Sequence, residues 1–237
     1  MPERERLLLH VCCGPCSTAV IERLRGSYEL ALYFYNPNIY PREEWELRAA
    51  EAEGYARDRG LPFIRGEWSH DEWLEAVRGL EAEPEGGRRC ERCFELRLLA
   101  TARLAAELGI PLFTTTLTVS PHKRAAQVNA AGERAVAALN REVAEDGSFG
   151  ESPGGLREGA VEGGGEGRAS GRESAENGRV CRVESCRTPV LGEMALPRFL
   201  AEDFKKRDGF LTSCRISKEA GMRRQDYCGC EFSMRMR

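Results

Sequence analysis

The chain has 237 residues, enough for one large domain or two small ones with a substantial core. Charged residues make up 31%, hydrophobic residues 41%, and the net charge is −3, which is typical of a globular protein and not of a disordered one. No apolar run reaches the roughly 18 residues of a membrane span, and residues 1–11 do not resemble a signal peptide. We therefore expect no membrane partner and a cytoplasmic location.

Strands and helices are expected to alternate along the chain. A short continuous apolar run such as 7–11 is typical of a buried parallel strand. The expected strands are 7–11, 30–35, 62–65 and 112–116, and the expected helices are 15–26, 41–60, 71–79, 93–108 and 121–138, the last with Ser120 as N-cap and Pro121 as its first residue. This order predicts an α/β fold in which helices flank a parallel sheet.

Polar and sulfur-bearing residues directly follow three of the predicted strands. They are Cys12 with Cys13, Asn36 with Asn38, and the segment 116–123. Ligands of open α/β sheets bind beyond the carboxyl ends of the strands. We therefore expect these residues to meet at one edge of the sheet.

Residues 141–195 have a different composition from the rest of the chain. They hold 12 of the 25 glycines and few large apolar residues. Such a segment cannot bury enough surface to offset the entropy of ordering it. We predict that 141–195 is a mostly disordered insertion in a single catalytic domain formed by 1–140 and 196–237.

Seven of the ten cysteines fall into three clusters, which are Cys12-Cys13-x-x-Cys16, Cys90-x-x-Cys93 and Cys228-Gly229-Cys230. In a reducing compartment, clustered thiols bind metal or perform chemistry and do not form disulfides. Thiolates are soft ligands that suit zinc or iron–sulfur clusters. The other three cysteines, Cys181, Cys186 and Cys214, are interpreted as incidental.

The second and third clusters together offer four ligands. Cys90 and Cys93 share a face in the first turn of a helix, whose positive end favours thiolates. Gly229 lets the backbone turn and approach a metal centre closely. Four thiolates complete either a zinc site or a cubane cluster.

The first cluster favours iron and sulfur over structural zinc, because seven convergent thiols exceed the four that zinc needs. Cys13 or Cys16 could alternatively pack as a small apolar residue. Beside this cluster, His122 and Lys123 fall at a helix N-terminus, where a phosphate or carboxylate is favoured. Several other basic residues could follow a nucleic-acid backbone or could simply be solvated: Arg88, Arg89, Lys205, Lys206, Arg215, Lys218, Arg223 and Arg224.

A set of short segments, which spans nearly all of the chain outside the insertion, carries a recognisable pattern. In order they are 8–17 (LLHVCCGPCS), 33–39 (YFYNPNI), 90–97 (CERCFELR), 113–123 (FTTTLTVSPHK), 203–206 (DFKK), 217–218 (SK) and 224–230 (RQDYCGC). The pattern resembles the QueH-type epoxyqueuosine reductases. The resemblance implies a fold like that of adenine-nucleotide α-hydrolases and PP-loop ATPases, with the cysteine-rich C-terminal segment closing a metal site.

The resemblance also implies two cofactors and a reaction. A 4Fe-4S cluster would be held by Cys90, Cys93, Cys228 and Cys230, and an adjacent mononuclear iron by Cys12 and Cys13, with Cys16 as a further candidate. The implied reaction removes the epoxide oxygen of epoxyqueuosine in tRNA, the last step of queuosine synthesis. An external donor supplies two electrons through the cluster, and the iron acts as a Lewis acid on that oxygen.

Further roles are assigned from this mechanism and from the positions of the residues in the predicted fold. The candidate catalytic residues are Cys12, Cys13, His122 and Tyr227, and His10 is a further candidate proton donor. The modified base of the anticodon loop must leave its stack to reach a metal pocket. The candidate residues for binding it are Asn36, Asn38, Thr116, Lys123 and Arg224.

Two other functions are compatible with parts of the pattern. An ATP-dependent tRNA-modifying enzyme of the PP-loop type would carry a Ser-Gly-Gly-x-Asp-Ser phosphate loop after the first strand, whereas this chain has the single-glycine sequence CCGPCS at 12–17. A non-catalytic zinc protein that binds RNA is the other alternative.

Overall fold

The computed structural model describes residues 4–146 and 196–234. Its centre is a five-stranded parallel sheet with the strand order β3-β2-β1-β4-β5. The strands are β1 (Glu5–His10), β2 (Tyr28–Phe34), β3 (Phe63–Arg65), β4 (Leu112–Thr115) and β5 (Arg198–Phe199). The predicted α/β fold with a parallel sheet between helices is therefore confirmed, and β5 is an edge strand that was not predicted.

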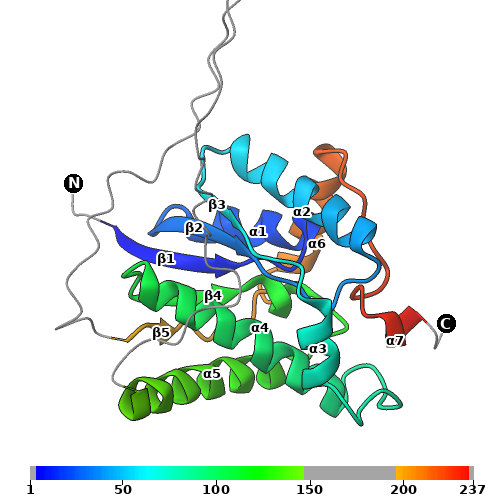
Figure 1. Cartoon of the computed structure of the whole chain (residues 1–237). Coiled ribbons are helices and arrows are strands. Elements are labelled where there is room, and N and C mark those ends of the chain that lie inside the picture. Colours follow the sequence, from blue (N-terminus) through cyan, green and yellow to red (C-terminus); the bar gives the residue numbers. More distant parts are fainter. Residues whose placement is uncertain (1–3, 147–195, 235–237) are drawn as a thin grey trace, which may run out of the picture.

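Helices cover both faces of the sheet (Figure 1). The helices α1 (Gly14–Leu24), α2 (Arg42–Arg57) and α6 (Gly209–Glu219) lie on one face, and α4 (Arg88–Glu107) and α5 (Ala125–Asp146) lie on the other. Two short helices, α3 (His70–Ala76) and α7 (Glu231–Met234), lie near each other beyond the carboxyl ends of the strands. A 3-10 turn, η1 (Thr116–Val119), follows β4 directly.

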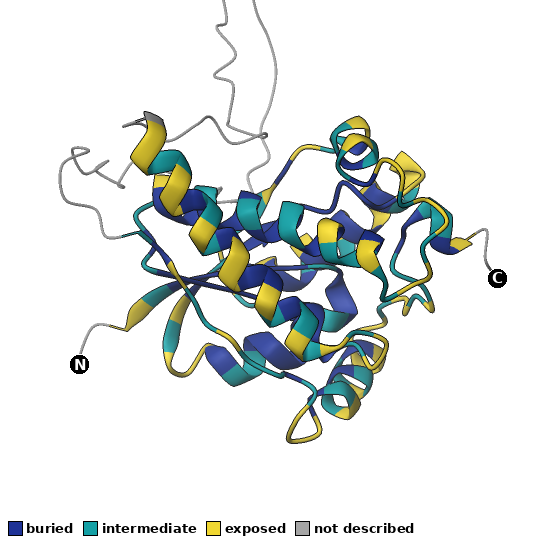
Figure 2. Cartoon of the chain, turned by 90° about the horizontal axis from the view of Figure 1, so that it is seen from below, coloured by how far each residue is buried: buried dark blue, intermediate teal, exposed yellow. Residues whose placement is uncertain are grey.

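Alternate residues of β1 divide the core into two layers. Leu7 and Leu9 pack with α1 and α2, whereas Leu8 packs with α4 and α5. All three are fully buried, and the buried side of each helix faces the sheet in Figure 2. A strand that is apolar at every position is required because successive side chains point to opposite faces and both faces are covered.

The main difference from the predicted elements lies after β4. The helix predicted from Pro121 begins four residues later, at Ala125, because residues 116–119 form the 3-10 turn. The Thr115 hydroxyl caps this turn by accepting a hydrogen bond from the Leu117 N–H at 3.1 Å. Ser120 is extended, as expected of a residue before proline. The helix then continues to Asp146, past the predicted end at 138.

Strand order brings the predicted site residues together. From β1 the chain passes to β2 and β3 on one side, and β4 lies on the other side, so the switch point falls between β1 and β4. The Cys12 N–H donates to Thr116 Oγ1 at 3.0 Å across this point, and the Asn36 amide donates to the Val11 carbonyl at 2.9 Å. The ends of β1, β2 and β4 thus meet at one edge, as predicted.

The predicted glycine-rich insertion, 141–195, falls mainly outside the described residues, as do Cys181 and Cys186. Its first six residues, 141–146, are the last residues of α5. Within 4–146 and 196–234, no helix has both the length and the apolar character needed to cross a bilayer.

Candidate metal centre and substrate pocket

The first cysteine cluster lies where β1 leads into α1. Cys13 is the N-cap of α1, and Pro15 falls in the first turn, where its missing N–H is not needed. The sulfurs of Cys12, Cys13 and Cys16 all lie within 4.8 Å of one another, and Cys12 Sγ is 4.0 Å from Cys13 Sγ. Among the described residues this is the one group of three or more such ligand atoms so close together. Its soft donors fit a transition-metal ion.

The three thiols of this cluster differ in acidity. Hydrogen bonds from Cys13 and Cys16, helped by the charges of Lys123 and Arg97, hold the pKa of Cys12 well below its ordinary value despite burial. The same hydrogen bonds to Cys12 raise the pKa of Cys13 to about 12 and also raise the pKa of Cys16. Thr116 Oγ1 also donates to Cys12 Sγ at 3.2 Å. Cys12 is therefore the thiolate of the group.

The second cluster lies in the first two turns of α4, with Cys90 half-buried as the third residue of the helix and Cys93 buried as the sixth. Burial raises the pKa of Cys90 to about 11 and raises the pKa of Cys93 as well. Loss of water on burial is the largest cause of both shifts. The Gly86 N–H does donate to Cys90 Sγ, at 3.2 Å.

The third cluster is held against the end of β2 by backbone contacts. The Asn38 amide donates to the Cys228 carbonyl at 3.3 Å, and the Tyr40 N–H donates to the Gly229 carbonyl at 3.0 Å. Gly229 has φ +95°, and a Cβ at this position would lie 2.9 Å from Ile39 Cγ1. Both the turn and the close approach therefore require glycine.

His70, at the start of α3, anchors the helix that follows the third cluster. Its Nδ1 donates to the Pro37 carbonyl at 2.8 Å, and its Nε2 is 2.9 Å from Glu231 Oε1 in α7. The imidazole ring also stacks at 5.1 to 5.5 Å on the rings of Tyr40, Trp68 and Trp73. His70 thus ties α3, the end of β2 and α7 together just beyond Cys230.

Two adjoining pockets collect the seven clustered cysteines. The first, the cluster pocket, has a volume of about 450 Å³ and is lined by Cys90, Cys93, Cys228 and Cys230, with Asn38 and Trp73. The second, the substrate pocket, has a volume of about 790 Å³ and is lined by Cys12, Cys13 and Cys16, with Arg48, Arg224 and Tyr227. The two pockets share the walls formed by Glu85, Arg97, His122, Lys123 and Cys228. Segments more than 200 residues apart in the sequence therefore meet here.

The four sulfurs of the cluster pocket are spaced more widely than the ligands of a single zinc ion. Zinc would hold four sulfurs about 2.3 Å from itself and hence within about 4 Å of one another. Among the described residues, no three of these four sulfurs lie within 4.8 Å of one another. A larger centre bound by four cysteines suits the wider spacing.

Lys123 and Arg97 carry positive charge in the wall that the two pockets share. Burial alone would lower the pKa of Lys123, but the charges of Cys228, Cys12 and Cys16 raise it. Cys228 is the second strongly acidic thiol, because a hydrogen bond from Cys230 and the charge of Lys123 hold its pKa well below the ordinary value. The hydrogen bond to Cys228 in turn raises the pKa of Cys230.

The predicted substrate-binding residues fall into two groups. Asn38 lines the cluster pocket with its buried Oδ1 lacking a partner among the described residues, and Lys123 and Arg224 line the substrate pocket. Asn36 is instead fully buried, donates to the Val11 carbonyl and accepts a hydrogen bond from Arg97. Thr116 is likewise buried, with its hydroxyl bonded to Cys12. These two side chains hold the site together and are not among the residues that line either pocket.

The candidate proton donors are also separated by the structure. His122 is exposed and lines both pockets, and Tyr227 is half-buried in the substrate pocket. His10 is fully buried, with Nδ1 2.8 Å from Thr115 Oγ1 and Nε2 3.1 Å from the Tyr35 carbonyl. Burial, followed by the charge of Arg97, lowers the pKa of His10 to about 3. His10 therefore remains neutral inside the fold.

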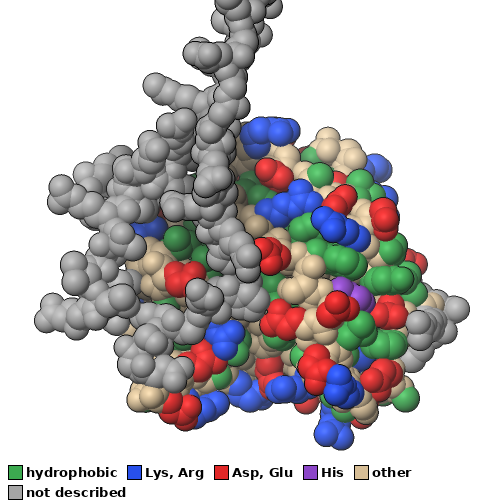
Figure 3. Space-filling view, in the orientation of Figure 1, with side chains coloured by type: hydrophobic (Ala, Val, Ile, Leu, Met, Phe, Trp, Pro, Cys, Tyr) green, Lys and Arg blue, Asp and Glu red, His purple; other side chains and the backbone are tan. Residues whose placement is uncertain are grey.

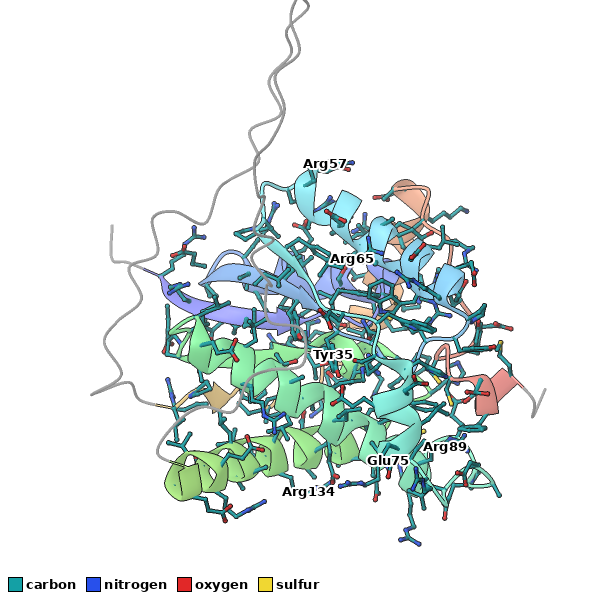
Figure 4. The ribbon with its side chains drawn as sticks, viewed as in Figure 1. Tyr35, Arg57, Arg65, Glu75, Arg89 and Arg134 are labelled. Carbon is teal, nitrogen blue, oxygen red and sulfur yellow. The ribbon has the colours of Figure 1, made fainter. Side chains whose placement is uncertain are left out.

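Several residues at the site were not predicted from the sequence. Arg97 lay within the 90–97 motif, but Arg48, His70 and Trp73 occur in ordinary amphipathic segments. Arg89, considered for a nucleic-acid backbone, is buried at the start of α4 (Figure 4). Its guanidinium donates to the carbonyls of Leu80, Glu81 and Glu83, and so it holds the loop before α4.

Comparison with known proteins identifies the family. The model of the family described as epoxyqueuosine reductase QueH matches residues 7–146 and 183–236. The chain belongs to the epoxyqueuosine reductase QueH family. The resemblance found in the motifs is thus confirmed, and with it the prediction of an epoxyqueuosine reductase, an oxidoreductase of queuosine biosynthesis.

Individual members of this family match over different lengths. The epoxyqueuosine reductase QueH of Streptococcus pyogenes is 30% identical over 98% of this chain and 72% of its own length. That of Histophilus somni is 42% identical, but the match covers 55% of this chain and 54% of that protein. That of Thermotoga maritima is 28% identical over 96% of this chain and 90% of its own.

Proposed function

We propose that this protein reduces epoxyqueuosine to queuosine in tRNA, the last step of queuosine biosynthesis, in the cytoplasm. The observation that carries the proposal is the meeting of seven thiols from three remote segments at two adjoining pockets. Family membership supports a reductase over the zinc protein and the ATP-dependent enzyme considered above. The sheet order supports the proposed likeness to PP-loop ATPases, but thiols stand in the loop after β1 where those enzymes hold phosphate.

The residues suit two metal groups. Cys90, Cys93, Cys228 and Cys230 would hold a 4Fe-4S cluster, and Cys12, Cys13 and Cys16 would hold a neighbouring iron ion. When bound, these groups supply two electrons, one at a time, and a Lewis acid for the epoxide oxygen. The segment 228–230 closes the cluster pocket through its contacts with Asn38 and Tyr40.

The protein's own side chains bind the substrate and move protons. The modified nucleotide leaves its stack in the anticodon loop and enters the substrate pocket, with Lys123 and Arg224 on its walls. Loss of the epoxide oxygen as water consumes protons, and His122 and Tyr227 are the candidate donors that line this pocket. His10 orients the end of β1 through Thr115 and takes no part in proton transfer.

The test is reduction of tRNA that carries epoxyqueuosine by anaerobically reconstituted protein with a chemical reductant. We expect brown protein that contains iron and acid-labile sulfide, and conversion to queuosine detected by mass spectrometry of the nucleosides. Cys228→Ser should lose the sulfide, the colour and the conversion. The matched control is Cys214→Ser on α6, outside the lining of both pockets, which should keep all three. Colourless wild-type protein with stoichiometric zinc, or a fully active Cys228→Ser protein, would contradict the proposal.

A further inference from the structure

Arg48 is a buried cation with an incomplete set of partners. It lies on α2 with 2% of its surface exposed. Its Nε donates to Glu44 Oε1 at 2.7 Å, and its guanidinium lies 5.0 Å from the centre of the Tyr227 ring. Its Nη2, although buried, has no hydrogen-bond partner among the described residues. A buried charged group with an unpaired donor is costly, so such donors normally have a partner in the working state of a protein.

The surroundings of Arg48 indicate where that partner comes from. Arg48 lines the substrate pocket, whose walls also carry Lys123 and Arg224. Gly229 packs against the other end of the guanidinium, since a Cβ there would lie 3.1 Å from Arg48 Nη1. Contact with the Tyr227 ring fixes the plane of the guanidinium further. The Nε of Arg48 is thus held by Glu44, and Nη2 is the donor of this pocket-lining residue that lacks a partner among the described residues.

Arg97 also has an unpaired donor, but its surroundings differ from those of Arg48. Its Nε also has no partner among the described residues. However, Arg97 lines both pockets, donates to Asn36 and places Nη1 4.0 Å from Cys93 Sγ. Its charge therefore balances the thiolates, whereas Arg48 lines the substrate pocket alone.

We propose that Arg48 binds a phosphate of the RNA backbone next to the modified nucleotide, an inference that rests on the proposed function. A nucleotide drawn out of a loop carries a phosphodiester on each side, and a guanidinium binds phosphate oxygens through a planar pair of donors. Acidic and basic side chains are interspersed on the face of the molecule seen in Figure 3. Arg48 thereby helps the pocket to select RNA over the free nucleoside.

The test compares removal of the arginine with removal of the phosphate charge. The ligand is an anticodon stem-loop RNA with epoxyqueuosine, in which the linkages on either side of the modified nucleotide are phosphodiester or uncharged methylphosphonate. For the wild type, we expect the uncharged linkages to raise Kd about tenfold, the effect of one charged hydrogen-bonded contact. Arg48→Gln should raise Kd for the phosphodiester RNA about tenfold. It should also reduce the slope of log K against log salt concentration, in magnitude, by about 0.7.

The decisive result is that the losses of binding free energy caused by Arg48→Gln and by the uncharged linkages do not add. Arg48→Gln and wild type should bind the uncharged RNA equally well, which also shows that the variant is folded. Arg42→Gln, on an exposed residue of the same helix, should behave as wild type throughout. Additive losses, or no loss in Arg48→Gln, would overturn the inference. If wild-type protein binds this RNA but does not reduce its epoxyqueuosine, the proposed function is contradicted. The comparison of Kd values would still decide whether Arg48 binds a phosphate.

Discussion

His10 shows how a single residue at the site can serve the fold and not the reaction. Its Nε2 faces a backbone carbonyl and therefore carries the proton, and its Nδ1 accepts from the Thr115 hydroxyl. Thr115 in turn accepts from the Leu117 N–H. This chain of hydrogen bonds fixes the ends of β1 and β4, from which Cys12 and Thr116 project. It requires neutral His10.

The neutral state of His10 predicts a pH dependence of stability. Because the pKa of His10 is about 3 in the folded protein and 6.5 in the unfolded chain, the unfolded chain binds more protons between these values. The contribution of His10 is complete above pH 6.5 and is lost as the pH falls towards 3. Between about pH 6.5 and about pH 5.5 the free energy of unfolding should fall by about 1 kcal/mol from this residue.

Urea unfolding at these two pH values measures this effect. His10→Gln should show a smaller fall than wild type, whatever its starting stability, because glutamine does not titrate. His122→Gln, at an exposed position, is the control, and its free energy of unfolding should fall as much as that of wild type. Equal falls in wild type and His10→Gln would show that folding does not lower the pKa of His10.

At the scale of elements, two helical glycines differ in the space around them: Gly132 in α5 is closely packed, whereas Gly54 in α2 is not. Gly132 lies in α5 beneath β5, and a Cβ there would lie 2.4 to 2.5 Å from ring atoms of Phe199. Phe199 in turn packs on Phe113 of β4, with ring centres 5.2 Å apart. Gly54 lies in α2, where a Cβ would have a nearest neighbour at 3.8 Å, the end of the Arg57 side chain.

Alanine at these two positions should therefore change stability in opposite directions. Gly132→Ala should lower the free energy of unfolding by about 1–3 kcal/mol, because the Phe199 ring must move. Gly54→Ala should raise it by about 0.5–1 kcal/mol, because alanine is the better helix former. Urea unfolding of both variants measures the difference. A stabilised Gly132→Ala protein would mean that β5 can move away from α5 at no cost.

The elements that could be predicted are those whose pattern depends on local sequence. The strand at 7–11 was recognised because both of its faces are covered, so that three consecutive leucines, Leu7 to Leu9, are buried. β5 consists of Arg198 and Phe199 and exists because it pairs with β4, a contact that no local pattern reveals. The 3-10 turn after β4 depends on a Thr115 side-chain bond, and it displaced the predicted start of α5.

At the scale of the whole molecule, strand order predicts the edge of the sheet at which Cys12 and Cys13 lie, and the number of clustered thiols predicts that the other two clusters join them there. Residues after parallel strands share an edge, and soft ligands in clusters indicate metal. The position of Arg48 could not be predicted in this way, since its importance comes from contacts with Glu44, Tyr227 and Gly229 that chain order does not specify. Asn36 and Thr116 were placed at the correct edge, but their side chains are used within the protein.

The chain also contains a segment, residues 147–182, that the family model does not match. The family model matches on both sides of residues 147–182 but not within them. We predict that replacing 147–182 by a short Gly-Ser linker leaves the iron content and the reduction of epoxyqueuosine unchanged. Shortening a connection to less than half its length should raise the free energy of unfolding by less than about 1 kcal/mol. Metal analysis and urea unfolding test this, and failure of the shortened chain to fold would assign the segment a structural role.

The position of Cys228 and Cys230 in the lining of the cluster pocket has a consequence for how the protein is made. The thiols at 12–16 leave the ribosome early, those at 90–93 follow, and the sulfurs of Cys228 and Cys230 come last of the three groups. During most of translation the nascent polypeptide therefore exposes reactive sulfur without the partners needed to enclose a metal centre. On the proposed function, a centre that takes ligands from all three groups forms only after the last-synthesised segment has emerged.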